Sequence, residues 1–213
     1  MAFVVELLNT IKMKMSTKEK TLAYFPLGIS LLPGDDIPLR IFEPRYKQLI
    51  NECKSGGTFG IPFIKDSEIQ RFGSEVKLRQ VVAENSLGEM VIIVEGVSVF
   101  EIISFEETIN NKLYGGGKVR MINEDRPVKD ADLMRILIYY TDHFDPDFLQ
   151  NIKNNEIFIF DVARALNLSS EEKFKFISYN DFHLKEKFLL SQMRYMMKLR
   201  EQEKLLSNDY GLN

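Results

Sequence analysis

The sequence predicts an α+β protein, in which a small β-barrel with one inserted helix is followed by a helical bundle. Short strand-like runs separated by Gly, Pro and Asn fill the chain up to about residue 126. From about residue 130 the apolar residues recur at three- and four-residue spacing, which is typical of helices. We therefore expect a β-rich barrel over residues 21–126 and a helical bundle ending in a long helix over residues 127–213. Closing the strands into a barrel would remove exposed sheet edges.

Residues 25–46 carry the densest local signals of the chain. Residues 25–27 are a short apolar run, and residues 32–35 are expected to turn, because proline presets φ and glycine accepts a positive φ. A strand is predicted over residues 37–42. The inserted helix follows at Glu43-Pro44, since proline at the first helical position loses no donor that the helix needs.

The remaining strands are interpreted largely from alternation and from glycine. They are expected over residues 58–64, 75–84, 90–95, 97–105 and 114–124. Pro62 restricts the first of these to a sheet edge or a bulge. A shift of apolar phase at Val81 predicts a bulge in the second. Residues 65–71 are interpreted as loop, Gly73 as part of a turn, and Gly96 as a strand break.

Four helices are predicted after Pro127. Ser169 or Ser170 is expected to cap the third, and the last should run from about residue 181 to 206. Their apolar stripes define the expected bundle core, and the residues that mark them are Leu133, Ile136, Leu137 and Tyr140, then Phe158, Val162, Ala163 and Leu166, then Phe182, Leu189, Met193 and Met196.

Residues 1–20 are interpreted as an N-terminal extension. Its apolar residues fall on one helical stripe, so an amphipathic helix is expected. Its basic residues follow the apolar run and Glu6 interrupts it, which does not fit a secretory signal peptide. Two alternatives stay open, namely a natural start at Met15 and a helix that lies on a membrane surface.

Composition narrows the functional classes. A net charge of −3 argues against a dedicated nucleic-acid binder, which normally carries a basic excess. No apolar run approaches the roughly 20 residues that span a bilayer, so no membrane partner is expected. The single cysteine, Cys53, rules out an intrachain disulfide and fits a reducing compartment, so we expect a cytoplasmic protein. Cys53 is interpreted as a small buried hydrophobic residue.

The motifs of common catalytic and cofactor sites are missing. A phosphate-binding loop needs G-x-x-x-x-G-K-[ST], but Lys112 and Val119 occupy required positions around Gly117-Lys118. His143 stands among three aspartates, which we interpret as an acidic helix end instead of a metal site, because zinc ligands come at defined spacings. We therefore expect no catalytic residues, no metal and no cofactor.

Binding is expected at two places. The first comprises Phe42, Glu43, Arg45 and Tyr46 at the junction of strand and helix. There Arg45 either pairs with Glu43 or an internal carbonyl to hold the helix, or borders a cleft whose apolar contacts are Phe42 and Tyr46. The second is Met197, which lies off the apolar stripe of the last helix, because flexible thioethers suit surfaces that accept varied apolar sequences.

Several motifs together resemble a known family. The run FPL, the LPG turn and the segment IPLRIFEPRY are similar to the start of the Lon substrate-binding domain, the N-terminal domain of ATP-dependent Lon proteases. FGI at residues 59–61, FGS at 72–74, VEGV at 94–97 and the segment DVARALNLSSEEKFKFI extend the resemblance over roughly residues 22–205. It implies a PUA-like pseudo-β-barrel followed by a helical bundle, in a stand-alone form without the ATPase and peptidase modules.

The resemblance implies a non-enzymatic module that binds exposed apolar segments of unfolded or partner proteins, with a protease as one possible recipient. Addition of a peptide strand at the edge that contains Pro62 is one variant of this binding. Two alternatives remain: an RNA-binding module, because PUA-like barrels of other families bind RNA, and a scaffold for one folded partner. The sequence does not indicate the oligomeric state.

Overall fold

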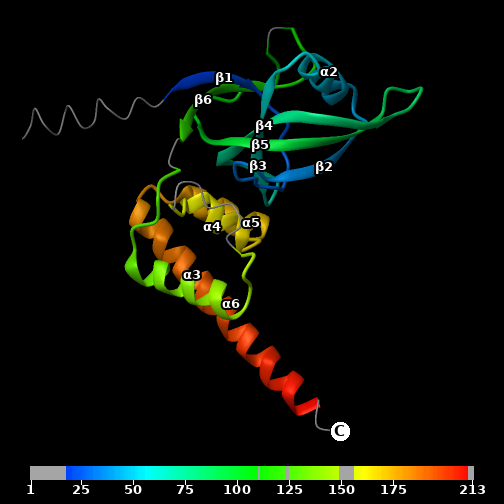
Figure 1. The fold of residues 1–213 in the computed structure, drawn as a ribbon. Coiled ribbons are helices and arrows are strands. Elements are labelled where there is room, and N and C mark those ends of the chain that lie inside the picture. Colours follow the sequence, from blue (N-terminus) through cyan, green and yellow to red (C-terminus); the bar gives the residue numbers. More distant parts are fainter. Residues whose placement is uncertain (1–17, 110, 123–124, 149–155, 211–213) are drawn as a thin grey trace, which may run out of the picture. The chain divides into compact units, whose positions relative to one another are not determined.

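The computed structural model describes residues 18–109, 111–122, 125–148 and 156–210 of the 213-residue chain (Figure 1). The chain separates into two compact units. The β unit is drawn from Met1–Leu27 and Asp36–Asn123, and the helical unit from Gly28–Asp35 and Glu124–Asn213. The predicted amphipathic helix falls on residues 1–17, which lie outside the described part.

In its described residues, the β unit is one antiparallel sheet of six strands with a single helix inserted. Along the sheet the order is β1-β6-β5-β4-β3, and β2 pairs with the first half of β5. The predicted α+β architecture is confirmed. The elements in chain order are β1 (Glu19–Ala23), β2 (Asp36–Ile41), α2 (Pro44–Cys53), β3 (Thr58–Lys65), β4 (Glu68–Glu84), β5 (Met90–Ile102) and β6 (Gly116–Ile122).

The segment that follows β1 closes the sheet on itself. β1 pairs with β6, and the chain then runs parallel to β3, with bridges from Tyr24 to Gly60 and from Leu27 to Phe63. The amide of Leu27 donates to the carbonyl of Pro62 (3.1 Å), and the amide of Ile64 donates to the carbonyl of Leu27 (2.9 Å). The variant of binding in which a peptide strand adds at the Pro62 edge is therefore wrong, because the protein's own chain occupies that edge.

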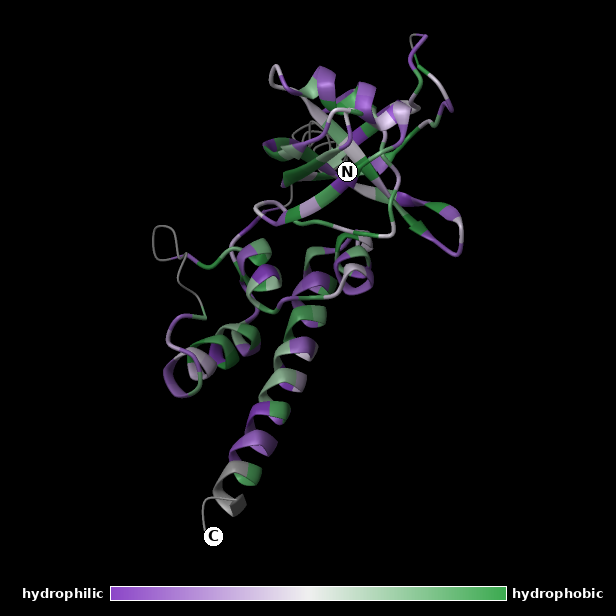
Figure 2. Ribbon diagram, turned by 90° about the vertical axis from the view of Figure 1, so that its right-hand side faces the viewer, coloured by the Kyte–Doolittle hydropathy of each residue, from purple (hydrophilic) through white to green (hydrophobic). Residues whose placement is uncertain are grey.

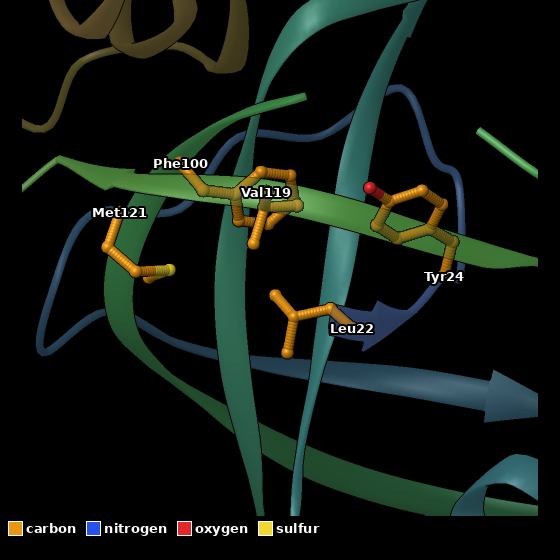
Figure 3. Close-up of a cluster of buried hydrophobic side chains, with 5 residues drawn as sticks. All are labelled: Leu22, Tyr24, Phe100, Val119 and Met121. Carbon is orange, nitrogen blue, oxygen red and sulfur yellow. The ribbon is translucent and has the colours of Figure 1, made fainter. Parts of the chain in front are cut away.

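The interior of the curled sheet is built around an aromatic ring lying on glycine backbone. Phe100 is fully buried, and its ring is 6.2 Å, centroid to centroid, from the ring of Tyr24. A Cβ on Gly60 or Gly73 would come within 2.9 Å or 2.7 Å of the Phe100 ring. At these two glycines, the backbone of β3 and of β4 therefore contacts the Phe100 ring directly, with no side chain in between. The side chains gathered there are Leu22, Tyr24, Phe100, Val119 and Met121 (Figure 3).

Two glycines were expected to interrupt strands and do not. Gly73 lies within β4 and Gly96 within β5, both of which are continuous. The β3–β4 turn instead falls at Asp66 and Ser67, whose φ angles of 51° and 65° fit a tight hairpin turn, so most of the predicted loop over residues 65–71 belongs to β4. The predicted bulges are confirmed, since the register shifts next to Pro62 and again around Val81.

The part of the helical unit that the structure describes contains four helices and the short segment Gly28–Asp35. Leu31 and Leu32 of that segment are buried, and Asp35 forms an ion pair with Lys173 (2.7 Å). We had expected this segment within the β-rich part, where its sequence position places it. The helices are α3 (Ala131–His143), α4 (Ile159–Ala165), α5 (Ser170–Ser178) and α6 (Phe182–Tyr210).

Helices α3 and α5 begin at capping residues that their sequences supply. The Asp130 carboxylate accepts hydrogen bonds from the amides of Asp132 and Leu133 at the start of α3. Ser169, one of the two expected candidates, caps α5 in a reciprocal arrangement with Glu172.

Helices α3 and α6 run in the same direction side by side. The Lys187 ammonium is 3.1 Å from the Asp130 carboxylate near their N-terminal ends, and the Arg200 guanidinium donates to the Tyr140 hydroxyl (3.2 Å) roughly three turns later. Met193 of α6 is fully buried. Figure 2 shows polar and apolar residues alternating along α6, as expected for an amphipathic helix.

We predict that Gly73→Ala lowers the free energy of unfolding by about 1–3 kcal/mol, because the new methyl group would overpack Phe100 and the carbonyl of Ile61. Urea unfolding followed by far-UV circular dichroism measures the change. Gly57→Ala is the matched control, because its Cβ would meet nothing closer than 3.8 Å. Equal stability of Gly73→Ala and the wild type would contradict the packing described here.

Candidate apolar binding site

The junction of β2 and α2 has the geometry that its sequence predicts. Glu43 is the N-cap residue with an extended backbone (φ −71°, ψ 137°), and Pro44 occupies the first helical position. The Glu43 carbonyl accepts from the amides of Tyr46 (3.1 Å) and Lys47 (2.9 Å), which begins the helix. Strand β2 ends at Ile41 and α2 begins at Pro44, a residue that suits the first turn of a helix. Phe42 therefore lies on the short link between them.

Helix α2 is held against the segment before β6 chiefly through the Glu52 carboxylate. The Tyr114 hydroxyl (2.7 Å) and the Lys112 ammonium (2.8 Å) both donate to Glu52. The hydrogen bonds from Lys112 and then Tyr114 hold the pKa of this carboxyl below its usual range. The Gln48 side chain also accepts from the amide of Leu113 (3.0 Å). These contacts set the position of α2, and with it that of Phe42 and Glu43.

Glu43 and Arg45 form a surface ion pair. The guanidinium donates to the Glu43 carboxylate at 2.8 Å and lies over the Tyr46 ring, 4.6 Å from its centroid. Of the two interpretations of Arg45 from the sequence, pairing with Glu43 is the one that matches this contact. Both side chains are substantially exposed, so the pair lies at the surface of the junction and adds little stability.

Tyr46 lies on the buried face of α2 and not on the surface. Its ring stacks on Phe25 with 3.9 Å between centroids, and only 7% of the residue is exposed. Burial raises the pKa of the Tyr46 hydroxyl, the charge of Glu43 raises it further, and Arg45 opposes the shift. In this structure Tyr46 offers almost no surface to a ligand, whereas it supports the link that carries Phe42.

Phe42 borders a concavity of about 560 Å³ at one end of the β unit. The Phe42 side chain is 63% exposed. In the neighbouring strands Ile41 is paired with Met90, and both are buried. The concavity is lined by three segments that are distant in sequence, which contribute Arg40, Ile41 and Phe42, then Ala83, Glu84 and Asn85, then Glu89, Met90 and Val91.

The loop between β4 and β5 is held in shape beside this concavity. The Asn85 side-chain oxygen accepts from the amides of Leu87 (3.0 Å) and Glu89 (2.9 Å). Lys47 of α2 donates to the Leu87 carbonyl (2.9 Å), which ties the loop to the helix. Leu87 itself is 73% exposed, and Val82 near the end of β4 is half exposed. The apolar surface around the concavity is therefore carried on a braced hairpin.

Met197 belongs to the helical unit, so the five predicted binding residues are divided between the two compact units. Met193 is core, as expected, whereas Met197 is half-buried and borders a groove of about 460 Å³ between α3 and α6. The residues of the β4–β5 hairpin and those of α3 at this groove were not among the binding residues predicted from the sequence. The Asn85 segment has the composition of a turn, so a hairpin at this position could have been predicted. The β2–β5 register, which brings that hairpin to Phe42, has no local sequence signature.

Within the described residues, no group of three or more His, Cys, Asp or Glu side chains converges as a metal site would require. The His143 ring stacks on Tyr139 (4.2 Å between centroids), and its Nδ1 is 3.0 Å from the Tyr139 carbonyl oxygen. None of the described helices has the length and apolar character needed to cross a membrane.

Comparison with known proteins identifies the family. The sequence matches the ATP-dependent protease La (LON) substrate-binding domain over residues 21–207. The chain belongs to this family. No curated protein matches it.

Two solved structures share the fold of this Lon substrate-binding domain protein. The Lon N-terminal domain protein from Xanthomonas campestris superposes with a TM-score of 0.59 at 23% identity, covering 81% of this chain and 98% of its own. The N-terminal domain of the Mycobacterium avium complex Lon protease gives a TM-score of 0.56 at 12% identity, covering 82% and 98%. The predicted family resemblance is confirmed over both the β-rich and the helical parts.

Cys53 is buried, as expected, and is free. Burial raises the pKa of its thiol to about 11, with a smaller contribution from the charge of Glu52. We predict that the native protein reacts with a disulfide reagent at pH 8 about 100-fold more slowly than the urea-unfolded protein, because the thiolate is the reactive form. Absorbance of the released thiol measures both rates, and equal rates would contradict the burial.

Proposed function

We propose that this protein is a polypeptide-binding module without catalytic activity of its own, and that the concavity beside Phe42 receives an apolar side chain of the bound segment. Membership of a substrate-binding domain family supports a binding role. The observation that carries the choice of site is the exposed Phe42 ring at the border of a concavity that the braced hairpin and β2 form together. Exposed aromatic residues beside pockets commonly anchor protein contacts.

The proposed contact is made by side chains and not by strand addition. The segment after β1 already engages the outer edge of β3. β2 has one edge without a strand partner among the described residues, and β2 carries Pro38 and the exposed Asp36 and Arg40. Proline cannot donate to a further strand, and charged edge residues disfavour pairing. Insertion of an apolar side chain next to Phe42 needs neither edge.

We propose an unfolded polypeptide or a partner protein as the ligand, with a protease as a possible recipient and the cytoplasm as the site of action. The neighbour from the Mycobacterium avium complex is the N-terminal domain of a Lon protease, which supports a link to proteolysis. The single buried Cys53 suits a reducing compartment. RNA binding is the competing class, and its dependence on salt would distinguish it.

We predict that Phe42→Ala weakens binding of a labelled, permanently unfolded polypeptide at least about tenfold, as expected for loss of an aromatic anchor. Fluorescence anisotropy at two salt concentrations measures the affinity. Leu113→Ala is the matched control, because Leu113 lies in the same unit and is 60% exposed against 63% for Phe42. Met197→Ala tests separately whether the groove of the helical unit also contributes.

Binding that is saturable, insensitive to salt and reduced only by Phe42→Ala is the expected result. Equal losses of affinity in Phe42→Ala and Leu113→Ala would show that the concavity beside Phe42 is not the binding site. No binding of the unfolded probe by the wild type, or binding that falls steeply with salt, would overturn the proposed function itself.

A further inference from the structure

The groove between α3 and α6 has an apolar floor and a charged rim. Leu190 at one end is nearly buried, Met197 is half-buried, and Tyr139 remains 44% exposed. The residues that line the groove are Ile136, Tyr139, Leu190 and Met197 on its floor and Asp132, Arg135, Arg194 and Glu201 on its rim.

The α6 side of the groove forms one continuous seam along the helix. Leu190, Arg194, Met197 and Glu201 follow each other at spacings of four, three and four residues, so they share one face. Leu205 continues this face and is 66% exposed. The spacing is that of a seam between packed helices. From Leu190 to Leu205 the seam is about 22 Å long at 1.5 Å per residue.

The charges of this seam have no ion-pair partner among the described residues. Neither Arg194 nor Glu201 forms an ion pair with any other described residue, whereas the neighbouring Arg200 pairs with Glu203 (3.0 Å) and Lys187 pairs with Asp130 (3.1 Å). Arg194 precedes Met197 by three residues and Glu201 follows it by four. The seam thus has a positive and a negative group about 10 Å apart, on either side of an apolar centre.

We propose that this groove binds α6 of a second copy of the chain, antiparallel and around a two-fold axis close to Met197. A two-fold interface requires a surface that is complementary to itself. Antiparallel pairing centred beside Met197 places Arg194 of each copy opposite Glu201 of the other. The two-fold axis therefore creates two equivalent ion pairs, in which all four charges have a partner. The same register places the exposed Leu205 of one copy over the Leu190 end of the other groove.

The size of the surface predicts a weak dimer. Two helices side by side present a face roughly 20 Å wide, so a seam of about 22 Å covers on the order of 440 Å² per copy and about 900 Å² in total. Stable interfaces usually bury about 1,200–2,000 Å², and smaller ones are typical of transient association. We therefore expect a monomer–dimer equilibrium with a dissociation constant in about the micromolar range.

Charge reversal and charge exchange test the proposed pairing. Sedimentation equilibrium of the full chain, up to about 500 µM, measures the association of the wild type. Arg194→Glu and Glu201→Arg each place like charges opposite each other, so each should raise the dissociation constant at least about tenfold. The double variant R194E/E201R should dimerise again, and an equimolar mixture of the two single variants should form a heterodimer, because opposite charges then face each other at both ends.

Glu203→Arg is the control, because Glu203 is an exposed acidic residue on the far side of the same helix and should leave association unchanged. Thermal unfolding verifies that each variant keeps its fold. A wild type that stays monomeric at about 500 µM would overturn the proposal, since a self-complementary seam of this size should associate in that range. Association unaffected by either single reversal, or no recovery in the mixture and the double variant, would overturn it as well.

Discussion

The β unit depends on the close approach of the Phe100 ring to the backbone of β3 and β4. Gly60 and Gly73 each leave a space that a Cβ would fill, and the ring occupies both spaces. Because the two strands can come this near to β5, the sheet curls enough for the segment after β1 to reach β3 and hydrogen-bond along it. The closed sheet then fixes where β2 ends, and the position of Phe42 follows from that end.

Local structure could be predicted from the sequence at positions where the residue type has a single structural effect. Pro44 marked the start of α2, Ser169 was one of two candidates for the cap of α5, and Pro62 indicated the irregular strand, all of which the structure bears out. Glycine was ambiguous, because the same residue permits a turn or a close packing contact. Gly73 serves the second purpose, and nothing within a few residues of it reveals the ring of Phe100, which is 27 positions away.

The candidate sites show the same division between local and distant information. The EPRY segment was identified correctly as a strand-to-helix junction, yet the sequence could not show that Tyr46 is covered by Phe25 while Phe42 stays exposed. Likewise the periodicity of α6 separated Met197 from the core position Met193. The groove that Met197 borders also needs α3, and the pairing of two helices depends on tertiary packing that no single helix encodes.

The short segment Gly28–Asp35 has a consequence for how the protein can be made. It is synthesised between β1 and β2, but the helices of the unit in which Leu31 and Leu32 are buried come after β6 in the chain, and Lys173 lies 138 residues after its partner Asp35. Contacts between such distant positions are slow to form, because a long loop must close first. The nascent chain therefore carries an apolar segment that its own unit cannot cover before the helices have been synthesised. A protein of a substrate-binding domain family thus exposes, while it is being synthesised, an apolar segment of its own.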